Sequence, residues 1–164
     1  MSAHRVRPAV ETDAAAICDI YNQGIDDRLA TLETERRTPE ERRHWLKSRG
    51  PRHPVIVAED DGRVIAWGSL NQFNPREAYR YVADLSIYVE RSARGRGVGR
   101  ALLPPVIDAA RTIGYHKMVL AALAYNDAGI ALYTRAGFSR VGVYREHGRL
   151  DGKWVDVVIM EKIL

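Results

Sequence analysis

The stretch ERSARGRGVGRALL, residues 90–103, places glycines at positions 95, 97 and 99 between arginines, directly before an apolar run. A β-rich run, residues 79–89, precedes it, and residues 98–114 have the apolar spacing of a helix that Gly114 would end. A strand that turns through glycines into a helix presents unpaired backbone N–H groups, and the positive end of the helix dipole reinforces them. The stretch therefore predicts a phosphate-binding loop.

Its context separates this loop from other glycine-rich segments. Glycine alternation also occurs in plain flexible turns, and arginine with glycine occurs in RNA-binding tails, but such tails are repetitive whereas this segment is a single copy. The loop lacks the Gly-Lys-Ser/Thr of a nucleotide P-loop, and its position in mid-chain argues against a dinucleotide fold. Phosphate binding is favoured, and a basic RNA-binding domain remains an alternative.

The composition is that of an ordinary soluble globular protein. The 164 residues are 46% hydrophobic and 28% charged, so we expect one domain over residues 1–164. The net charge of +4 favours anionic partners, phosphorylated cofactors as much as nucleic acid. The first residues lack an apolar signal stretch, and no run approaches the roughly 18 apolar residues of a membrane span. We expect a cytoplasmic protein with no membrane partner.

Helical and β periods alternate along the rest of the chain. The clearest local signals are the capping box of Thr38 and Glu41 around Pro39, and the turn at residues 60–62, Asp-Asp-Gly, between two β-rich runs. The expected order is β α α β β β α β α β β. The corresponding ranges are 4–10, 12–24, 38–50, 54–60, 63–71, 79–89, 98–114, 116–123, 126–137, 138–148 and 153–164.

Pro104 and Pro105 fall inside the helix expected at residues 98–114. Each proline removes a backbone hydrogen bond and clashes with the preceding turn, at a cost of roughly 3 kcal/mol when it is not accommodated. We therefore expect a kink or a broken hydrogen-bond ladder at this point.

The segment Arg94-Gly95-Arg96-Gly97-Val98-Gly99 resembles the Q/R-x-x-G-x-G/A signature with which the GNAT superfamily of acyl-CoA N-acyltransferases binds the CoA pyrophosphate. The order of elements is similar to the GNAT order, and the resemblance covers nearly the whole chain. IYNQGI, ADLSIYV, LYTRAGF and GRLDGKWVDVVIME resemble the phosphinothricin N-acetyltransferase branch. IYNQGIDDRLATLETE, NPREAY and ARGRGVGRALL are similar to the arsinothricin N-acetyltransferases, which detoxify an arsenic-containing glutamate analogue.

The resemblance implies a GNAT fold, an α/β (α+β) architecture in which a mixed sheet of about seven strands is flanked by about four helices. It places a bulge in the strand before the loop, where that strand parts from its neighbour. It implies a homodimer to which the last two strands contribute, with simple core packing of those strands as the alternative. The residues that it assigns to CoA are Ile87, Tyr88, Val89, Arg94, Gly95, Arg96, Gly97, Val98, Gly99, Arg100 and Asn126.

The implied activity is transfer of an acetyl group from acetyl-CoA to the amino group of a small amino-acid-like acceptor, by direct attack in a ternary complex. Such a transfer needs a base for the protonated amine, a donor for the carbonyl oxygen and an acid for the leaving thiolate. Asp84 lies where the related enzymes usually carry glutamate, and the shorter side chain would act as base through a water. Tyr133 matches a tyrosine near the CoA sulfur, and a phenol is protonated at pH 7.

Structural roles remain open for three of these residues. Asp84 could be an ordinary solvated strand residue, Tyr133 a core aromatic, and Asn126 a plain residue at the start of a helix. Two further functions also stay open, namely acetylation of a protein or peptide N-terminus and binding of acyl-CoA without catalysis. No aromatic stripe accompanies the arginines, which argues against nucleic acid as a partner.

A glutamate analogue carries two anionic groups, which calls for arginine because its planar fork binds oxyanions in pairs. Arg76 in NPREAY is the first candidate, with a solvated surface arginine as the alternative reading. Asn74, Thr34 and Ser86 are further candidates for the acceptor site. The five histidines show no metal-ligand spacing, so we expect no metal.

Overall fold

The computed structural model describes residues 4–164. A seven-stranded sheet has the order β1-β2-β3-β4-β5-β7-β6. Neighbouring strands in the described part of the chain are antiparallel except β4 and β5, which are parallel. The strands are β1 (Arg5–Pro8), β2 (Val55–Asp60), β3 (Arg63–Gln72), β4 (Val82–Val89), β5 (Lys117–Leu123), β6 (Ser139–Leu150) and β7 (Lys153–Ile163).

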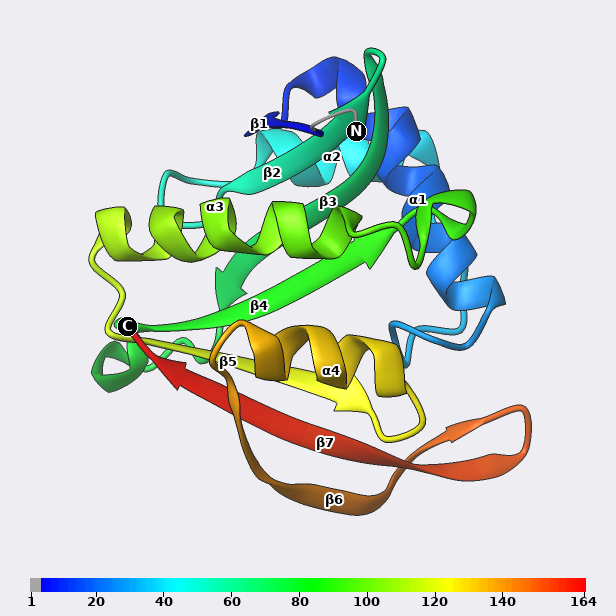
Figure 1. Cartoon of the computed structure of the whole chain (residues 1–164), viewed down its shortest axis with the longest axis vertical. Coiled ribbons are helices and arrows are strands. Elements are labelled where there is room, and N and C mark those ends of the chain that lie inside the picture. Colours follow the sequence, from blue (N-terminus) through cyan, green and yellow to red (C-terminus); the bar gives the residue numbers. More distant parts are fainter. Residues whose placement is uncertain (1–3) are drawn as a thin grey trace.

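Four helices cover the two faces of this sheet (Figure 1). They are α1 (Ala14–Asp26), α2 (Pro39–Lys47), α3 (Val98–Ile113) and α4 (Asp127–Arg135). Helices α1 and α2 lie behind the sheet in the view of Figure 1, and α3 and α4 lie in front of it. The expected order of elements and the expected fold class, a mixed sheet flanked by helices, are both confirmed.

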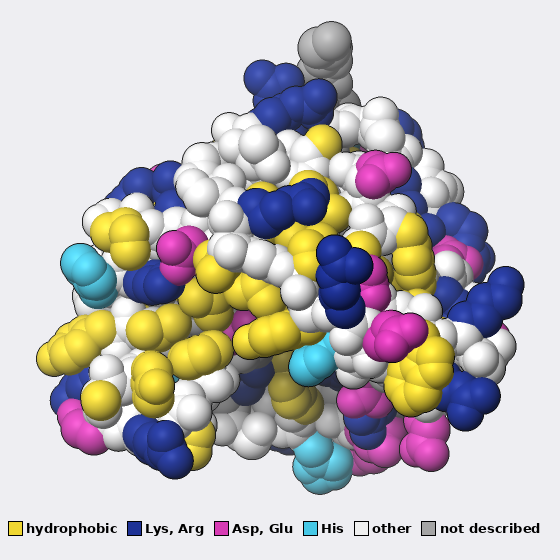
Figure 2. All heavy atoms as spheres, turned by 90° about the horizontal axis from the view of Figure 1, so that it is seen from below, with side chains coloured by type: hydrophobic (Ala, Val, Ile, Leu, Met, Phe, Trp, Pro, Cys, Tyr) yellow, Lys and Arg dark blue, Asp and Glu magenta, His cyan; other side chains and the backbone are white. Residues whose placement is uncertain are grey.

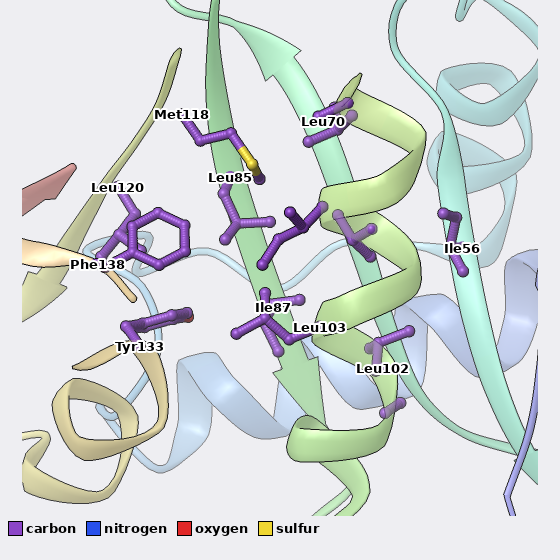
Figure 3. Packing of buried hydrophobic residues seen from close by; sticks show 14 of the residues in the cluster. Ile56, Leu70, Leu85, Ile87, Leu102, Leu103, Met118, Leu120, Tyr133 and Phe138 are labelled. Carbon is purple, nitrogen blue, oxygen red and sulfur yellow. The ribbon is translucent and has the colours of Figure 1, made fainter. Parts of the chain in front are cut away.

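A hydrophobic cluster lies between the sheet and each pair of helices. On the α3 side, Leu102 and Leu103 point onto the strands, and Tyr133 and Phe138 close the cluster beside α4 (Figure 3). Leu102 is 0% exposed, and burying a leucine side chain of this kind contributes roughly 2 kcal/mol. This packing holds the start of α3 against the end of β4, where the glycine-rich loop connects them.

The capping box predicted around Thr38 is confirmed. The Thr38 side chain accepts a hydrogen bond from the Glu41 N–H, and the Glu41 carboxylate accepts one from the Thr38 N–H. The expectation that Gly24 ends the first helix is wrong, because α1 continues to Asp26. A Cβ on Gly24 would lie 3.5 Å from the Cβ of Ala30, so this glycine allows a close approach of the chain that follows the helix.

Helix α3 runs through Pro104 and Pro105 as one continuous helix (Figure 1). Because neither proline has an N–H, the carbonyl groups of Arg100 and Ala101 lack their usual partners four residues later. The predicted loss of ladder bonds therefore follows from the covalent structure, but the helix does not break.

Strands β4 and β5 part in the middle of the sheet. Their parallel pairing covers Val82 to Asp84 of β4, whereas β5 continues to Leu123 beside β7. The resemblance predicted a bulge in β4. No bulge is found where β4 pairs with β3, because the described register between the two strands is unbroken from Gln72 to Ala66 of β3. The predicted parting of this strand from its neighbour is nevertheless present. The hydrogen-bonded pairing of β4 with β5 ends at Asp84, and beyond that residue the two strands are no longer paired.

Candidate active site

The glycine-rich loop forms one wall of a cavity of about 540 Å³. Gly95 and Gly97 have φ angles of 74° and 81°, and Gly97 is the N-cap of α3. The N–H groups of the first turn of a helix have no partner within the helix, so they are free to bind an anion. The predicted CoA residues that line this cavity are Ile87, Tyr88, Val89, Arg94, Gly95, Gly97, Val98, Gly99, Arg100 and Asn126.

The three glycines of the loop serve two different purposes. A Cβ on Gly95 or Gly97 would meet no atom within 4 Å, so the space in front of these residues is open to a ligand. A Cβ on Gly99 would lie 2.9 Å from Cδ2 of Leu132, so Gly99 lets α3 approach α4. Arg96 is exposed and is not part of the cavity lining.

Asp27, which sequence reasoning missed, braces the loop from the end of α1. Its carboxylate accepts a hydrogen bond from Nη1 of Arg94 at 2.6 Å and binds Arg91 through both oxygens. These hydrogen bonds, from Arg91 first and then from Arg94, lower the pKa of Asp27. Arg94 also donates from Nε to the Val89 carbonyl at 3.2 Å. The guanidinium of Arg94 is thus held beside the cavity by α1 and β4.

Asn126 combines its place in the lining with a local structural role. Its Oδ1 accepts a hydrogen bond from the Gly129 N–H at 3.0 Å and so caps α4. The N-cap of α4 is therefore Asn126, and the neighbouring Asp127 is the first residue of the helix.

A second cavity, of about 190 Å³, lies where β4 and β5 have separated. Its lining comprises Ala30, Thr31, Leu32, Asp84, Leu85, Ser86, Ile87, Tyr88, Ala121, Ala122, Leu123, Tyr133 and Val157. Four of these residues, Ala30, Ile87, Tyr88 and Tyr133, also line the larger cavity. The two cavities therefore adjoin one another, and Asp84 lines the smaller one.

Asp84 and Tyr133 are brought together at this junction. Burial raises the pKa of Asp84 to about 6. Burial also raises the pKa of the Tyr133 phenol, and the charge of Asp84 raises it further. At neutral pH the site consequently holds an ionised carboxylate close to a protonated phenol, which is the pair that a proton acceptor and a proton donor require.

Tyr88 lines both cavities and packs against two other aromatic side chains. Its ring centroid lies 4.5 Å from that of Trp67 and 5.1 Å from that of Tyr21. The guanidinium of Arg42 stacks on the Tyr21 ring at 4.0 Å. These contacts restrict the motion of Tyr88 and keep the junction in one shape.

The expected acceptor residues are not gathered in one place. Ser86 lines the smaller cavity, and its Oγ accepts a hydrogen bond from Nδ2 of Asn71 at 3.2 Å. Arg76 is exposed in the β3–β4 connection, where its N–H donates to Oδ1 of Asn74. Thr34 is exposed too, and it is Thr31 of the same segment that reaches the cavity. The residues that the structure describes in this lining include no lysine or arginine.

Within residues 4–164, no three or more His, Cys, Asp or Glu side chains are grouped so that they could hold a metal ion. In the same range, no helix has the length and apolar character to cross a membrane.

The comparison with family models matches residues 17–138 to the acetyltransferase (GNAT) family. Among curated proteins, the phosphinothricin N-acetyltransferase of Streptomyces coelicolor is 34% identical over 164 residues, covering 98% of this chain and 96% of that protein.

Solved structures agree with this match. A phosphinothricin acetyltransferase of Sinorhizobium meliloti in complex with acetyl-CoA is 30% identical with a TM-score of 0.93, covering 99% of this chain and 89% of that one. A ribosomal-protein-alanine N-acetyltransferase from Brucella melitensis is 37% identical with a TM-score of 0.94, covering 98% and 99%.

Proposed function

This chain belongs to the GNAT family of acetyltransferases and is an acetyl-CoA-dependent N-acetyltransferase, and we propose that its acceptor is a glutamate-analogue antibiotic such as phosphinothricin or arsinothricin. The observation that carries this proposal is the meeting of two cavities at Tyr88 and Tyr133, with Asp84 in the smaller one. The larger cavity suits the donor, because it lies on the anion-binding loop. The smaller cavity suits an acceptor of amino-acid size.

The proposed reaction is a direct attack in a ternary complex. The carboxylate of Asp84 removes a proton from the acceptor ammonium group, through a water because the side chain is short. The freed nitrogen attacks the thioester carbonyl carbon, the amide bond forms, and the carbon–sulfur bond breaks. The second proton that the nitrogen loses as it becomes an amide replaces the one that the leaving thiolate takes from its proton donor. Backbone N–H groups of β4 residues 87–89 face the donor in this scheme and stabilise the carbonyl oxygen.

Tyr133 is proposed to serve the leaving thiolate. The raised pKa of its phenol keeps the proton in place at neutral pH, so the hydroxyl group can donate to the sulfur as negative charge develops there. Its position in the lining of both cavities supports this role. Arg76, Asn74 and Thr34 stay predictions as acceptor contacts, and Ser86 is supported by its place in the cavity.

A second candidate is acetylation of a peptide or protein N-terminus. It is favoured by the likeness to the structure from Brucella melitensis, which is 37% identical and named a ribosomal-protein-alanine N-acetyltransferase.

A panel of acceptors separates these two candidates. Purified protein is assayed for CoA release with phosphinothricin, arsinothricin, methionine sulfoximine and a peptide with N-terminal alanine. We expect kcat/KM for the glutamate analogues to exceed that for the peptide by at least about 100-fold, since the 190 Å³ cavity is of amino-acid size. Activity on peptides alone would contradict the antibiotic acceptor, and turnover of no amine at all would contradict catalysis.

We further propose that the protein is a cytoplasmic homodimer. β6 lies at the edge of the sheet, where unpaired backbone groups favour association with another strand. Large hydrophobic side chains on β6 and β7 are exposed, and Figure 2, seen from this side of the molecule, shows hydrophobic groups gathered there. They are Val141, Val143, Tyr144, Trp154 and Ile163. Acetyl-CoA is an intracellular metabolite, which supports the cytoplasm as the location.

Sedimentation equilibrium tests the dimer. We expect a mass near twice the 18.5 kDa of one chain. The variant Val141→Glu, which introduces a charge on β6, should yield monomers because a buried unpaired charge opposes association. Val10→Glu is the matched control, since Val10 is similarly exposed, at 52% against 57%, but lies near β1. A wild-type protein that sediments as a monomer would refute the proposal.

A further inference from the structure

An arginine occupies a backbone position that favours glycine at the end of α1. Arg28 has a φ angle of 52°, in the left-handed region that residues with a Cβ disfavour. The Arg28 N–H donates to the Ile25 carbonyl at 3.1 Å, and the Leu29 N–H donates to the Gly24 carbonyl at 3.3 Å. Helix ends of this shape usually carry glycine or asparagine. The identity of this residue therefore calls for an explanation in its side chain.

The side chain of Arg28 binds the turn between β6 and β7. Its Nε and Nη2 atoms donate to the two carboxylate oxygens of Asp151 at 3.0 and 3.1 Å, and Nη1 donates to the Ile25 carbonyl at 3.1 Å. The hydroxyl group of Tyr125 donates to the Arg28 carbonyl. Both the main chain and the side chain of Arg28 are thus attached to the half of the protein that follows β5.

The segment anchored in this way, residues 29–32, contributes a shared wall to the two cavities. Leu29 and Ala30 line the donor cavity, and Ala30, Thr31 and Leu32 line the acceptor cavity. Leu32 makes a second contact with the β6–β7 hairpin, because a Cβ on Gly148 would lie 2.8 Å from the Leu32 Cδ2. The position of this wall depends on the hairpin at both of its ends.

We propose that Arg28 is a positioning residue that fixes residues 29–32 against the β6–β7 hairpin and thereby sets the shape of the acceptor cavity. This inference rests on the proposed function of that cavity. The neighbouring Asp27 holds Arg91 and Arg94 of the donor loop, whereas Arg28 holds Asp151. These two consecutive residues therefore hold different parts of the site. Loss of the Arg28 contacts should weaken binding of the acceptor, whereas the donor loop keeps its contacts with Asp27.

The variant Arg28→Gly distinguishes this role from a merely structural one. Glycine relieves the left-handed backbone, so the melting temperature should stay level or rise even though the side-chain contacts are lost. The acceptor KM should rise about tenfold, and the acetyl-CoA KM should change by less than about twofold. Asp61→Gly is the matched control, because Asp61 also has a positive φ of 47° and lies in the β2–β3 turn.

Asp151→Ala provides an independent route to the same result. It should raise the acceptor KM to a similar extent, and the double variant Arg28→Gly/Asp151→Ala should show no further rise because the two residues act as one contact. If the rises in acceptor KM of the two single variants added up in the double variant, the ion pair between Arg28 and Asp151 would not be the cause of those rises.

Hydrogen exchange of the acetyl-CoA-bound protein gives a readout that does not depend on the acceptor. The amides of residues 29–32 should exchange faster in Arg28→Gly than in wild type and in Asp61→Gly. Unchanged exchange, an unchanged acceptor KM, or an equal rise of both KM values with a lower melting temperature would each overturn the inference. A wild-type protein that acetylates no amine would instead refute the proposed function, and the exchange rates would still decide whether Arg28 fixes the wall.

Discussion

Replacing Asp84 by asparagine should lower kcat for acetyl transfer by roughly 10²- to 10⁴-fold, the usual effect of removing a general base. Asparagine keeps the shape of the side chain but cannot take a proton from the acceptor ammonium group. The acetyl-CoA KM should stay the same, because the donor loop is separate from Asp84. Steady-state CoA release measures both constants. Asp108→Asn, at a carboxylate on α3 that is 72% exposed, is the matched control.

The pH dependence of the same group gives a second test of its role. Burial raises the pKa of Asp84 to about 6, so kcat/KM of the wild type should fall as the pH drops through that value. Because the folded pKa lies above the ordinary value of 3.8, the folded protein binds this proton more tightly than the unfolded chain does. This tighter proton binding adds to the free energy of unfolding. The added stability is complete below pH 3.8 and is lost as the pH rises through about 6.

An ionised Asp84 therefore destabilises the folded protein at pH 7. Asp84→Asn should raise the melting temperature at pH 7 and leave it nearly unchanged at pH 4, which differential scanning calorimetry can measure. Unchanged turnover in this variant would remove Asp84 from the mechanism. Lost turnover together with a lower melting temperature at pH 7 would mean that the carboxylate is needed for folding.

Replacing Gly97 by alanine should raise the acetyl-CoA KM by about 100-fold, because a methyl group would enter the space in which we propose that the backbone meets the pyrophosphate. The φ angle of 81° also makes any Cβ unfavourable here, at a cost of about 1–2 kcal/mol in stability. Isothermal titration with CoA measures the binding directly, and chemical denaturation measures the stability.

Gly62→Ala separates these two effects. Gly62 has a φ of 77° in the β2–β3 turn, and a Cβ at this position would meet no atom within 4 Å, as at Gly97. The control should lose a similar amount of stability and bind CoA normally. If Gly97→Ala also bound CoA normally, the loop would not be the pyrophosphate site.

Local interactions explain how much of the fold could be predicted from the sequence. The capping box at Thr38 and Glu41 and the left-handed glycines at positions 62, 97 and 114 act over a few residues, so their patterns are visible in the chain. The end of α1 was placed wrongly at Gly24, because that glycine serves a contact with Ala30 that is six residues away and depends on the fold.

The same distinction between local patterns and contacts that depend on the fold applies to the candidate site. Family motifs predict Tyr133 and Asp84 as site residues, and both line the smaller cavity, but no motif indicates Asp27, since its partner Arg94 lies 67 residues away in the chain. The need of anions for arginine predicts Arg76 as an acceptor residue, but Arg76 lies outside the lining of the smaller cavity, whereas Thr31 and Leu32 belong to it. Charge and residue type indicate what a side chain could bind, but they do not indicate which cavity it reaches.

By itself, the sequence indicated the family, the donor and the loop that we propose to bind it, because a pyrophosphate can be held by consecutive backbone groups whose glycines can be read directly from residues 94–99. The tertiary structure decided the acceptor cavity. Its walls come from β4, β5, α4 and the segment after α1, and they meet only because β4 and β5 separate at Asp84 and because Arg28 reaches Asp151 across 123 residues of chain. Such contacts depend on the packing of whole elements, which no short stretch of sequence contains.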